Sequence, residues 1–189
     1  SGTNVVDENW VPYANANVRA LAVLSDGSVM AGGYFTMVNG ISRPNLVKLD
    51  GHGSGLLDST WDAKLTDAVF SIATTPSDDL YIGGDFFGLG GVGDLYVARL
   101  ASAGHGAVDP NWAANADLEV DTVSVNAQGN VFIGGYFRTV GTHARQGLAI
   151  VSSNAQALPA MDAEIPGIAW ALAKQPNGGT IVGGQFSRA

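Results

Sequence analysis

Short apolar segments, separated by glycine and polar turn residues, recur four times along the chain. The segment VFIGGYF at 131–137 has near copies at 29–35, 80–86 and 180–186, each with a glycine pair among apolar residues and a phenylalanine two residues after the pair. The first glycines of the pairs are separated by 51, 51 and 49 residues: Gly32, Gly83, Gly134 and Gly183. A repeat of about this length is typical of propellers, solenoids and other repeat proteins.

Each repeat is predicted to contain three or four antiparallel β-strands. Before each glycine pair stands an apolar run that is followed by a turn such as Asp-Gly or Asn-Gly, which favours a tight hairpin. Short runs rich in Val, Ile and Leu indicate strands, and no segment shows a sustained helical period. The first runs lie at 18–23, 68–74, 120–125 and 169–174, and later runs of the same kind lie at 45–50, 95–101 and 147–152.

The predicted fold is therefore an all-β propeller, or a segment of one, with blades of about 51 residues. The chain of 189 residues is long enough for one domain, 1–189. Its repeat units run approximately over 15–65, 66–116 and 117–165, with a partial unit over 166–189. A blade that neighbours cover on both faces explains why strict alternation of polar and apolar residues is missing.

The glycine pairs predict close packing between neighbouring sheets. Glycine inside a strand costs roughly 0.5–1 kcal/mol relative to alanine. Four pairs in register therefore imply that another backbone or a large ring approaches closely at these positions. We expect the phenylalanine after each pair to be a core residue that packs on the next blade: Phe35, Phe86, Phe137 and Phe186.

The repeats leave the ring incomplete. The sequence starts inside an Asp-x-x-Trp segment and stops after the fourth glycine-pair strand, so it holds three units and part of a fourth. Three arrangements follow: a piece of a longer propeller, four blades of which one is defective, or two chains that complete each other. We favour the first arrangement, and we expect the unpaired strand edges to promote self-association.

Charge and composition exclude several classes of function. Charged residues make up only 14% of the chain, and 9 Lys and Arg against 17 Asp and Glu give a net charge of −8. This balance argues against a nucleic-acid partner or an anionic membrane, because both require clustered positive charge. No stretch approaches the roughly 18 apolar residues that span a bilayer, so membrane insertion is not expected. The absence of Cys excludes disulfides, thiolate metal sites and Cys nucleophiles.

An Asp-x-x-Trp segment closes three of the units and supplies the first candidate binding residues. The residues are Asp7, Asp58 and Asp109 with Trp10, Trp61 and Trp112. As a ligand site they would form one rim of the propeller, where carboxylates bind Ca²⁺ or sugar hydroxyls and indole rings stack on a sugar. As structural residues, the acids would bond backbone N–H groups of a turn and the tryptophans would anchor the outer strand. Recurrence once per unit favours the structural role.

Two further groups of charged residues stand out. Asp78, Asp79 and Asp85 form a dense acidic group and are the candidate metal site. Ca²⁺ is the cation that such a site would take, but Ca²⁺ requires 6–8 oxygen ligands and the sequence shows few. Lys48 and Arg99 occupy equivalent positions and are expected to pair with acids of an adjacent blade. No other cofactor is expected, because the sequence offers no constellation of catalytic acid, base and nucleophile.

A glycine-pair strand followed by Phe, a strand reading VKLD or VARL, and a closing Asp-x-x-Trp segment together resemble the repeat of bacterial delta-sixty type propellers. Kelch propellers, with a glycine doublet and a later Trp, are a looser match. The resemblance implies a secreted or cell-surface location in bacteria and no shared catalytic residue. The chain departs from the pattern at Ile150, where two other units carry Lys48 and Arg99, and the fourth unit lacks both Asp and Trp.

These features predict a non-enzymatic binding or scaffold module with a protein or carbohydrate partner. One alternative is a lectin-like propeller that uses the repeated Trp and Asp residues. A second alternative is a propeller glycosidase, which needs two carboxylates roughly 5–10 Å apart in a cleft.

Overall fold

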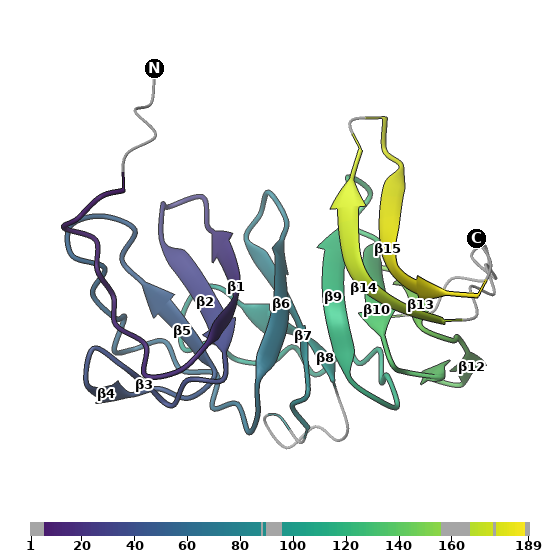
Figure 1. Ribbon diagram of the computed structural model, residues 1–189, viewed down its shortest axis with the longest axis horizontal. Coiled ribbons are helices and arrows are strands. Elements are labelled where there is room, and N and C mark those ends of the chain that lie inside the picture. Colours follow the sequence, from purple (N-terminus) through teal and green to yellow (C-terminus); the bar gives the residue numbers. More distant parts are fainter. Residues whose placement is uncertain (1–5, 88, 90–95, 156–166, 176, 188–189) are drawn as a thin grey trace.

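The computed structural model of the chain describes residues 6–87, 89, 96–155, 167–175 and 177–187 (Figure 1). Within these residues no α-helix occurs, and the strands form four main antiparallel sheets. The prediction of an all-β chain is confirmed. The junction between the third and fourth predicted units, around 165 and 166, lies outside the described residues.

The four sheets are named blades 1 to 4 in chain order. Blade 1 contains, from its inner to its outer strand, β1 (Val18–Val23), β2 (Val29–Gly33) and β5 (Leu46–Leu49). Blade 2 contains β6 (Val69–Thr74), β7 (Asp79–Gly84) and β8 (Val97–Ala101). Blade 3 contains β9 (Val120–Val125), β10 (Val131–Gly135) and β13 (Leu148–Val151). Blade 4 contains β14 (Gly167–Lys174) and β15 (Thr180–Phe186).

Two short hairpins lie outside these sheets, in the loops before the third strands of blades 1 and 3. They are β3 (Met37–Val38) with β4 (Ile41–Ser42) and β11 (Thr139–Val140) with β12 (His143–Ala144).

The blades stand in a row, and the first strand of each blade lies on the same side of the molecule. In Figure 1 this side faces the viewer, with β1, β6, β9 and β14 in front and the third strands behind. Each first strand contacts the first strand of the next blade. This arrangement is a segment of a β-propeller, as predicted. Blades 1 and 4 lie at opposite ends of the row, so these four blades do not close a ring by themselves (Figure 1).

The Asp-x-x-Trp segments run along the outer strands of blades 1 and 2. Leu57 forms a single antiparallel bridge with Leu49 of β5, and Val108 forms the equivalent bridge with Leu100 of β8. The segments therefore act as a rudimentary fourth strand, which agrees with the expected three to four strands per blade.

The first glycine of each pair makes room for the next blade. A Cβ atom added to Gly32 would lie 2.7 Å from Cγ1 of Val69, which belongs to the first strand of blade 2. The same addition at Gly83 would meet Val120 and Val123 of blade 3 at 2.7 Å. Such distances are shorter than carbon atoms tolerate, so only glycine fits where two sheets approach this closely.

The second glycine of each pair makes room for the first strand of its own blade. A Cβ atom added to Gly33 would lie 2.1 Å from the carbonyl oxygen of Asn17, and one added to Gly84 would lie 2.1 Å from that of Ala68. At this point each first strand contains a β-bulge, because its register against the second strand shifts by one residue. The extra residues at the bulges are Arg19, Phe70, Asp121 and Trp170.

Three of the four phenylalanines after the glycine pairs are core residues, whereas Phe186 is half-buried. Phe86 and Phe137 pack on the preceding blade and not on the next one. Phe35, Phe86 and Phe137 are fully buried. Phe86 shares a cluster with Met30 of blade 1, and Phe137 shares one with Tyr81 of blade 2. The spacing along the strand explains why these rings face the preceding blade. The phenylalanine lies three residues after the first glycine, and an odd separation along extended backbone places two side chains on opposite faces.

The two kinds of environment at the first glycine give a testable difference in stability. We expect Gly83→Val to lower the free energy of unfolding by about 2–3 kcal/mol or more, because the new side chain would collide with blade 3. Gly183→Val is the matched control in blade 4, where the nearest atom to an added Cβ is the Cβ of Ala171 at 3.7 Å. Its cost should be below about 1 kcal/mol. Urea denaturation at low protein concentration measures both values, and equal costs would contradict the assignment.

Candidate functional site

The three Asp-x-x-Trp segments form the same turn. The Oδ1 atom of Asp58 accepts a 2.9 Å bond from the backbone N–H of Thr60, and its carbonyl accepts a 3.4 Å bond from the N–H of Trp61. Asp109 and Asp7 make the same pair of bonds with the residues two and three positions later. The hydrogen bond from Thr60 holds the pKa of Asp58 below its ordinary value. These acids are occupied in holding a turn.

The tryptophans of these segments join one blade to the next. The indole N–H of Trp61 donates to the carbonyl of Ala101 at 3.1 Å, and that of Trp112 donates to the carbonyl of Ser152 at 3.3 Å. Trp10 donates to the carbonyl of Asp50 at 2.9 Å. The side chains of Trp61 and Trp112 are 0% and 2% exposed. Neither ring presents a face on which a sugar could stack.

The candidate metal ligands lie apart. Asp78 accepts a 2.9 Å bond from the backbone N–H of Ser25, whereas Asp85 lies beyond the other end of β7. Asp79 accepts a 2.6 Å bond from Arg99; burial raises the pKa of Asp79, but the bonds from Arg99 and Ser77 outweigh it and the net shift is downward. In the part of the chain that the structure describes, no three His, Asp or Glu residues are grouped to hold a metal ion.

Lys48 and Arg99 pair with acids of their own blades and not with those of an adjacent blade. Lys48 lies 3.4 Å from Asp26 in the hairpin turn of blade 1. Arg99 bridges Asp79 and Asp109, at 2.6 and 3.5 Å, and so ties the second strand of blade 2 to its closing segment. The expectation of cross-blade pairing was wrong because Arg99 and Asp79 lie on neighbouring strands of one sheet, only two positions out of register.

A different set of residues gathers at one end of the sheets. We call it the bulge edge, and it consists of the four bulge residues, the residue after each glycine pair, and Glu119 before the third bulge. The bulge residues Arg19, Phe70, Asp121 and Trp170 are all chemically different, whereas their neighbours along the strand are small or β-branched in every blade. The residues after the glycine pairs are Tyr34, Asp85, Tyr136 and Gln185. A bulge turns its extra residue out of the regular pleat of the sheet, so the four bulge residues lie at the edge, two of them exposed and two half-buried.

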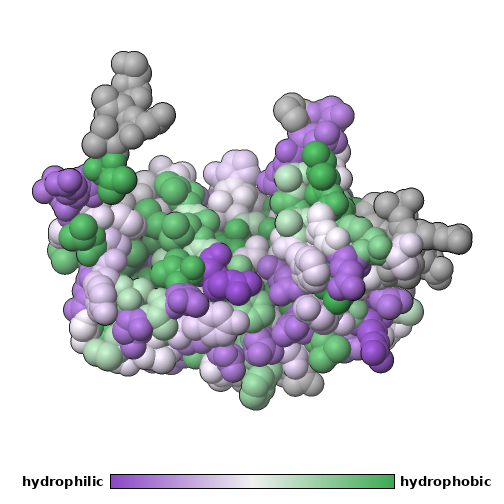
Figure 2. Space-filling model, in the orientation of Figure 1, coloured by the Kyte–Doolittle hydropathy of each residue, from purple (hydrophilic) through white to green (hydrophobic). Residues whose placement is uncertain are grey.

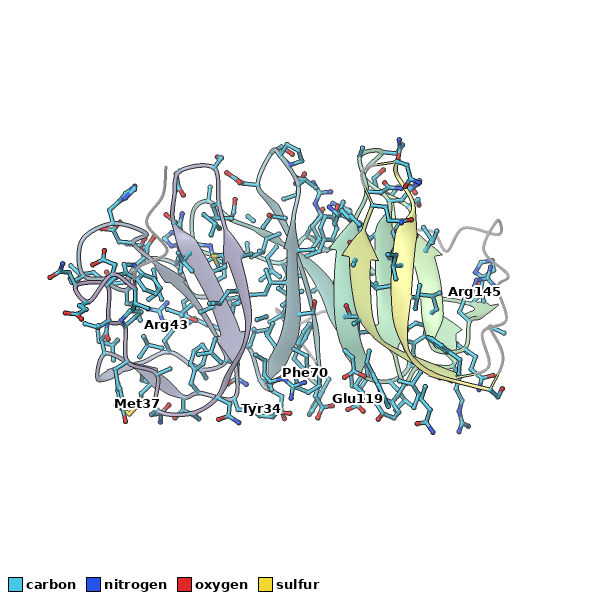
Figure 3. The ribbon with its side chains drawn as sticks, turned by 45° about the horizontal axis from the view of Figure 1, so that its top comes forward. Tyr34, Met37, Arg43, Phe70, Glu119 and Arg145 are labelled. Atoms are coloured by element: carbon cyan, nitrogen blue, oxygen red, sulfur yellow. The ribbon has the colours of Figure 1, made fainter. Side chains whose placement is uncertain are left out.

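Aromatic rings and a guanidinium meet on blades 1 and 2 at this edge. The Cζ atom of Arg19 lies 5.2 Å from the centre of the Phe70 ring, and the Tyr34 ring centre lies 5.7 Å from it. Figure 3 shows Tyr34, Phe70 and Glu119 along the same lower edge of the molecule. The arrangement is a cation–π contact built from two neighbouring blades.

The carboxylates of the bulge edge have raised pKa values. Burial raises the pKa of Asp121, and the positive charge of Arg19 offsets only part of the rise. Burial also raises the pKa of Glu119, with further contributions from the negative charges of Asp121 and Asp85. The Oδ2 atom of Asp121 is buried and accepts no hydrogen bond from a described residue. Clusters of perturbed acids are more frequent at functional sites than elsewhere.

Small-molecule pockets typically have volumes of about 300–1,000 Å³. A hollow of about 520 Å³ opens at the bulge edge between blades 3 and 4. Its lining includes Tyr136, Arg138, Gln146 and Gln185. No carboxylate is among the described residues that line it, so it lacks the acid pair that a glycosidase cleft requires.

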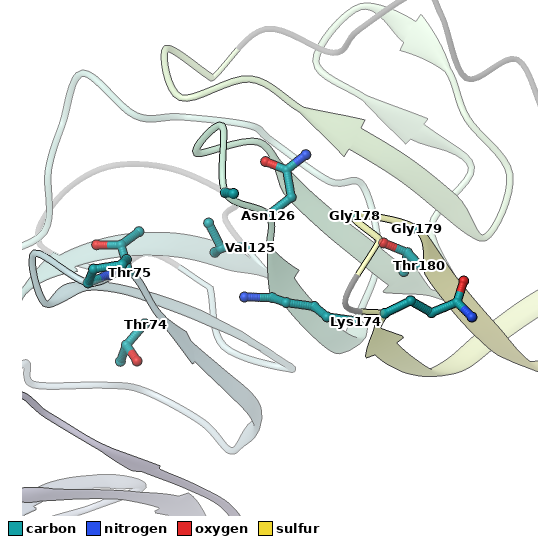
Figure 4. A pocket seen from close by; sticks show the side chains of 11 residues that line it. Thr74, Thr75, Val125, Asn126, Lys174, Gly178, Gly179 and Thr180 are labelled. Carbon is teal, nitrogen blue, oxygen red and sulfur yellow. The ribbon is translucent and has the colours of Figure 1, made fainter.

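A second hollow lies at the opposite edge, between the hairpin turns of blades 2, 3 and 4. It has a volume of about 270 Å³ and is lined by Thr75, Asn126, Lys174 and Thr180 among others (Figure 4). The surface that lines this hollow is mostly apolar, and Lys174 is the one titratable side chain among its described residues. The bulge edge is therefore the better candidate site.

The sequence carries a signal for the bulge edge in positions that vary between the repeats. The residues that recur in each unit hold the fold and do not mark this edge. The informative positions read VRA, VFS, VDT and AWA, where the central residue changes its chemistry completely between constant neighbours. Variation inside a repeat marks positions that packing does not constrain.

The fold and the site define a propeller module, and comparison with known proteins agrees. A family model described as a domain of unknown function (DUF5122) beta-propeller matches residues 24–60, from the turn after β1 into the segment that closes blade 1. No curated protein matches the sequence. Among the described residues, no helix has the length and apolar character to cross a membrane.

The salt bridge of Asp79 predicts a pH-dependent loss of stability. Its folded pKa lies below the ordinary value of 3.8, so its contribution is present above pH 3.8 and is lost as the pH falls through the folded value. We expect Asp79→Asn to lower the free energy of unfolding at pH 7 by about 1 kcal/mol, a modest figure because the pair is partly exposed. In thermal melts from pH 7 to pH 2, the Tm values of the wild type and the variant should converge. A constant difference in Tm would contradict the prediction.

The raised pKa of Asp121 predicts that its removal stabilises the fold at pH 7, in contrast to the removal of Asp79. A carboxyl whose folded pKa is raised destabilises the fold above that pKa, and the cost disappears below the ordinary value of 3.8, where both states are protonated. Asp121→Asn should therefore raise Tm at pH 7 by about 1–3 °C and leave it unchanged at pH 3. A fall in Tm at pH 7 would show that the carboxylate stabilises the fold.

Proposed function

We propose that the chain is a non-catalytic binding module, and that it recognises cationic side chains of a partner protein at the bulge edge. The proposal rests on the four bulge residues, Arg19, Phe70, Asp121 and Trp170. One bulge position per blade differs completely in chemistry; Arg19 and Trp170 are exposed there, and Phe70 and Asp121 are half-buried.

The chemistry of the edge favours a positively charged ligand. Tyr34, Tyr136 and Trp170 are 47%, 43% and 49% exposed, so their rings are open to solvent. Carboxylates beside exposed rings are the combination that binds ammonium and guanidinium groups. Arg19, seated on Phe70 near Asp121, is an example of this recognition within the molecule itself. The net charge of −8 would also steer a cationic partner toward the chain.

The energetics support the same conclusion. Asp85, Glu119 and Asp121 have raised pKa values, so their charges cost stability in the unbound protein. Residues that lower stability at one exposed edge are typical of sites maintained for function. A bound cation would lower these pKa values and would recover part of the cost.

The location belongs to the proposal as well. The resemblance to delta-sixty type propellers supports a secreted or cell-surface protein of bacteria, and the absence of Cys is compatible with that. Fractionation of cells that produce the full-length parent protein tests the location: recovery only in the cytosol would overturn it.

A hexa-arginine peptide is the probe that tests recognition at the bulge edge. We expect it to bind and to change the fluorescence of Trp170, the exposed tryptophan of the edge. The double variant Glu119→Gln/Asp121→Asn should bind about tenfold more weakly, because each lost charge contact contributes about 1 kcal/mol or less. Isothermal titration calorimetry measures the affinities, and hexa-glutamate serves as the ligand control.

A matched variant separates local recognition from overall charge. Asp26→Asn/Asp78→Asn removes the same charge at the opposite edge, in the hairpin turns. Its affinity for hexa-arginine should stay within about twofold of the wild type. Equal losses in the two double variants, or equal binding of hexa-glutamate, would reject the bulge edge as the site.

A further inference from the structure

The side chain of Arg19 is held at the bulge edge by few contacts. It is exposed, and its Cζ atom lies 5.2 Å from the centre of the Phe70 ring. Within the part of the chain that the structure describes, this side chain forms neither a hydrogen bond nor an ion pair. A group that displaced the guanidinium from the ring would therefore break no hydrogen bond to a described residue.

The surface on which Arg19 rests is built from three blades. Phe70 of blade 2 is half-buried, and the ring of Tyr34 from blade 1 lies beside it at 5.7 Å between ring centres. Blade 3 contributes Asp121, whose buried Oδ2 atom accepts no hydrogen bond from a described residue. Burial raises the pKa of Asp121, and the positive charge of Arg19 offsets part of that rise. Aromatic rings beside a carboxylate without a hydrogen-bond donor match the needs of a guanidinium group.

Backbone hydrogen bonds fix the strands that carry these side chains. The N–H of Tyr34 donates to the carbonyl of Asn17 at 2.9 Å, directly across from the bulge of blade 1. Next to Phe70, the Oγ atom of Ser71 accepts a 3.0 Å bond from the N–H of Val123, which joins the first strands of blades 2 and 3. The receiving surface is therefore formed before a ligand arrives, and ordering it costs little.

The surface is open to a partner. Tyr34 is 47% exposed, and Figure 3 shows Tyr34 and Phe70 along one edge of the molecule. Figure 2 shows hydrophilic side chains, in purple, on the lower half of the front face, below the apolar surface of the first strands. A charged ligand can reach this edge without crossing apolar surface.

We propose that Phe70, Tyr34 and Asp121 form a guanidinium subsite, which Arg19 occupies in the free protein and an arginine of the partner occupies in the complex. The inference rests on the proposed function and narrows its ligand from cations in general to arginine side chains. A guanidinium is planar, weakly hydrated and stacks on aromatic rings, whereas the ammonium of lysine is compact and strongly hydrated. Arg19 is the example of the fitting group within the molecule itself.

Arg19 then acts as an internal competitor. A ligand binds the subsite only in the fraction of molecules in which Arg19 has left it, so its apparent affinity is reduced by that fraction. The contact between an exposed arginine and a ring is weak enough for exchange, and its loss corresponds to a two- to fivefold change in affinity, roughly. Arg19 is thus a residue that sets both the strength and the selectivity of binding.

The test compares hexa-arginine with hexa-lysine by isothermal titration calorimetry. Arg19→Ala should raise the affinity for hexa-arginine about two- to fivefold and that for hexa-lysine less, so the ratio of the two affinities increases. Arg138→Ala is the matched control, because it removes the same charge from an exposed side chain beside the hollow of blades 3 and 4. It should change both affinities by one factor and leave their ratio at the value of the wild type.

A second variant shows whether the gain depends on the ring. Arg19→Ala/Phe70→Leu keeps an apolar side chain at the bulge but removes the stacking surface, so the ratio should return to that of the wild type. Circular dichroism and thermal melts show whether each variant is folded. A ratio that Arg19→Ala leaves unchanged, or a gain that persists without Phe70, would overturn the subsite.

The two proposals fail in different ways. Binding of hexa-arginine that is lost in Glu119→Gln/Asp121→Asn, together with no effect of Arg19→Ala, would keep the bulge edge as the site and reject the guanidinium subsite. Hexa-arginine that binds neither the wild type nor Arg19→Ala would reject both.

Discussion

The structure depends on one steric constraint, the approach of each first strand to the bare backbone of the preceding blade. At Gly134 an added Cβ would lie 2.7 Å from the Cβ of Ala169, so the observed packing of blades 3 and 4 leaves no room for a side chain at this position. Glycine in a strand costs roughly 0.5–1 kcal/mol, and each blade accepts that cost because burial of the neighbouring sheet exceeds it. The side-by-side packing of successive blades depends on this contact.

The same glycine pair links the fold to the candidate site. Its second member, such as Gly135 at 2.3 Å from the carbonyl of Glu119, admits the bulge in the first strand. The bulge removes one residue per blade from the packed face and directs it to the edge. Packing therefore constrains every neighbour of Asp121 or Trp170 but not the bulge residue itself. The bulges that the glycine pairs admit therefore provide the positions at which the residue type can vary between blades.

Two classes of carboxylate can be distinguished by their environment. Acids in turns and ladders, such as Asp58 and Asp79, have pKa values lowered by hydrogen bonds and by neighbouring cations, and they stabilise the fold. Acids at the bulge edge have raised pKa values. Burial raises the pKa of Asp121 more than Arg19 lowers it, and burial together with the charges of Asp121 and Asp85 raises the pKa of Glu119. Asp58 recurs in register as Asp7 and Asp109, whereas Glu119 and Asp121 have no acid at the equivalent positions of the other units. This separation is the physical basis for treating one group as structural and the other as a candidate site.

The sequence by itself determined the repeat, the all-β class, the close approach at the glycines and the burial of Phe35, Phe86 and Phe137, because these follow from local spacing and steric size. It did not determine which neighbour Phe86 packs against or that Arg99 pairs within its own blade, since both depend on strand register and on the direction in which each sheet faces. Nor did it reveal the bulge edge. Arg19, Phe70 and Asp121 stand 51 residues apart, and only the packing of successive blades brings them to one edge.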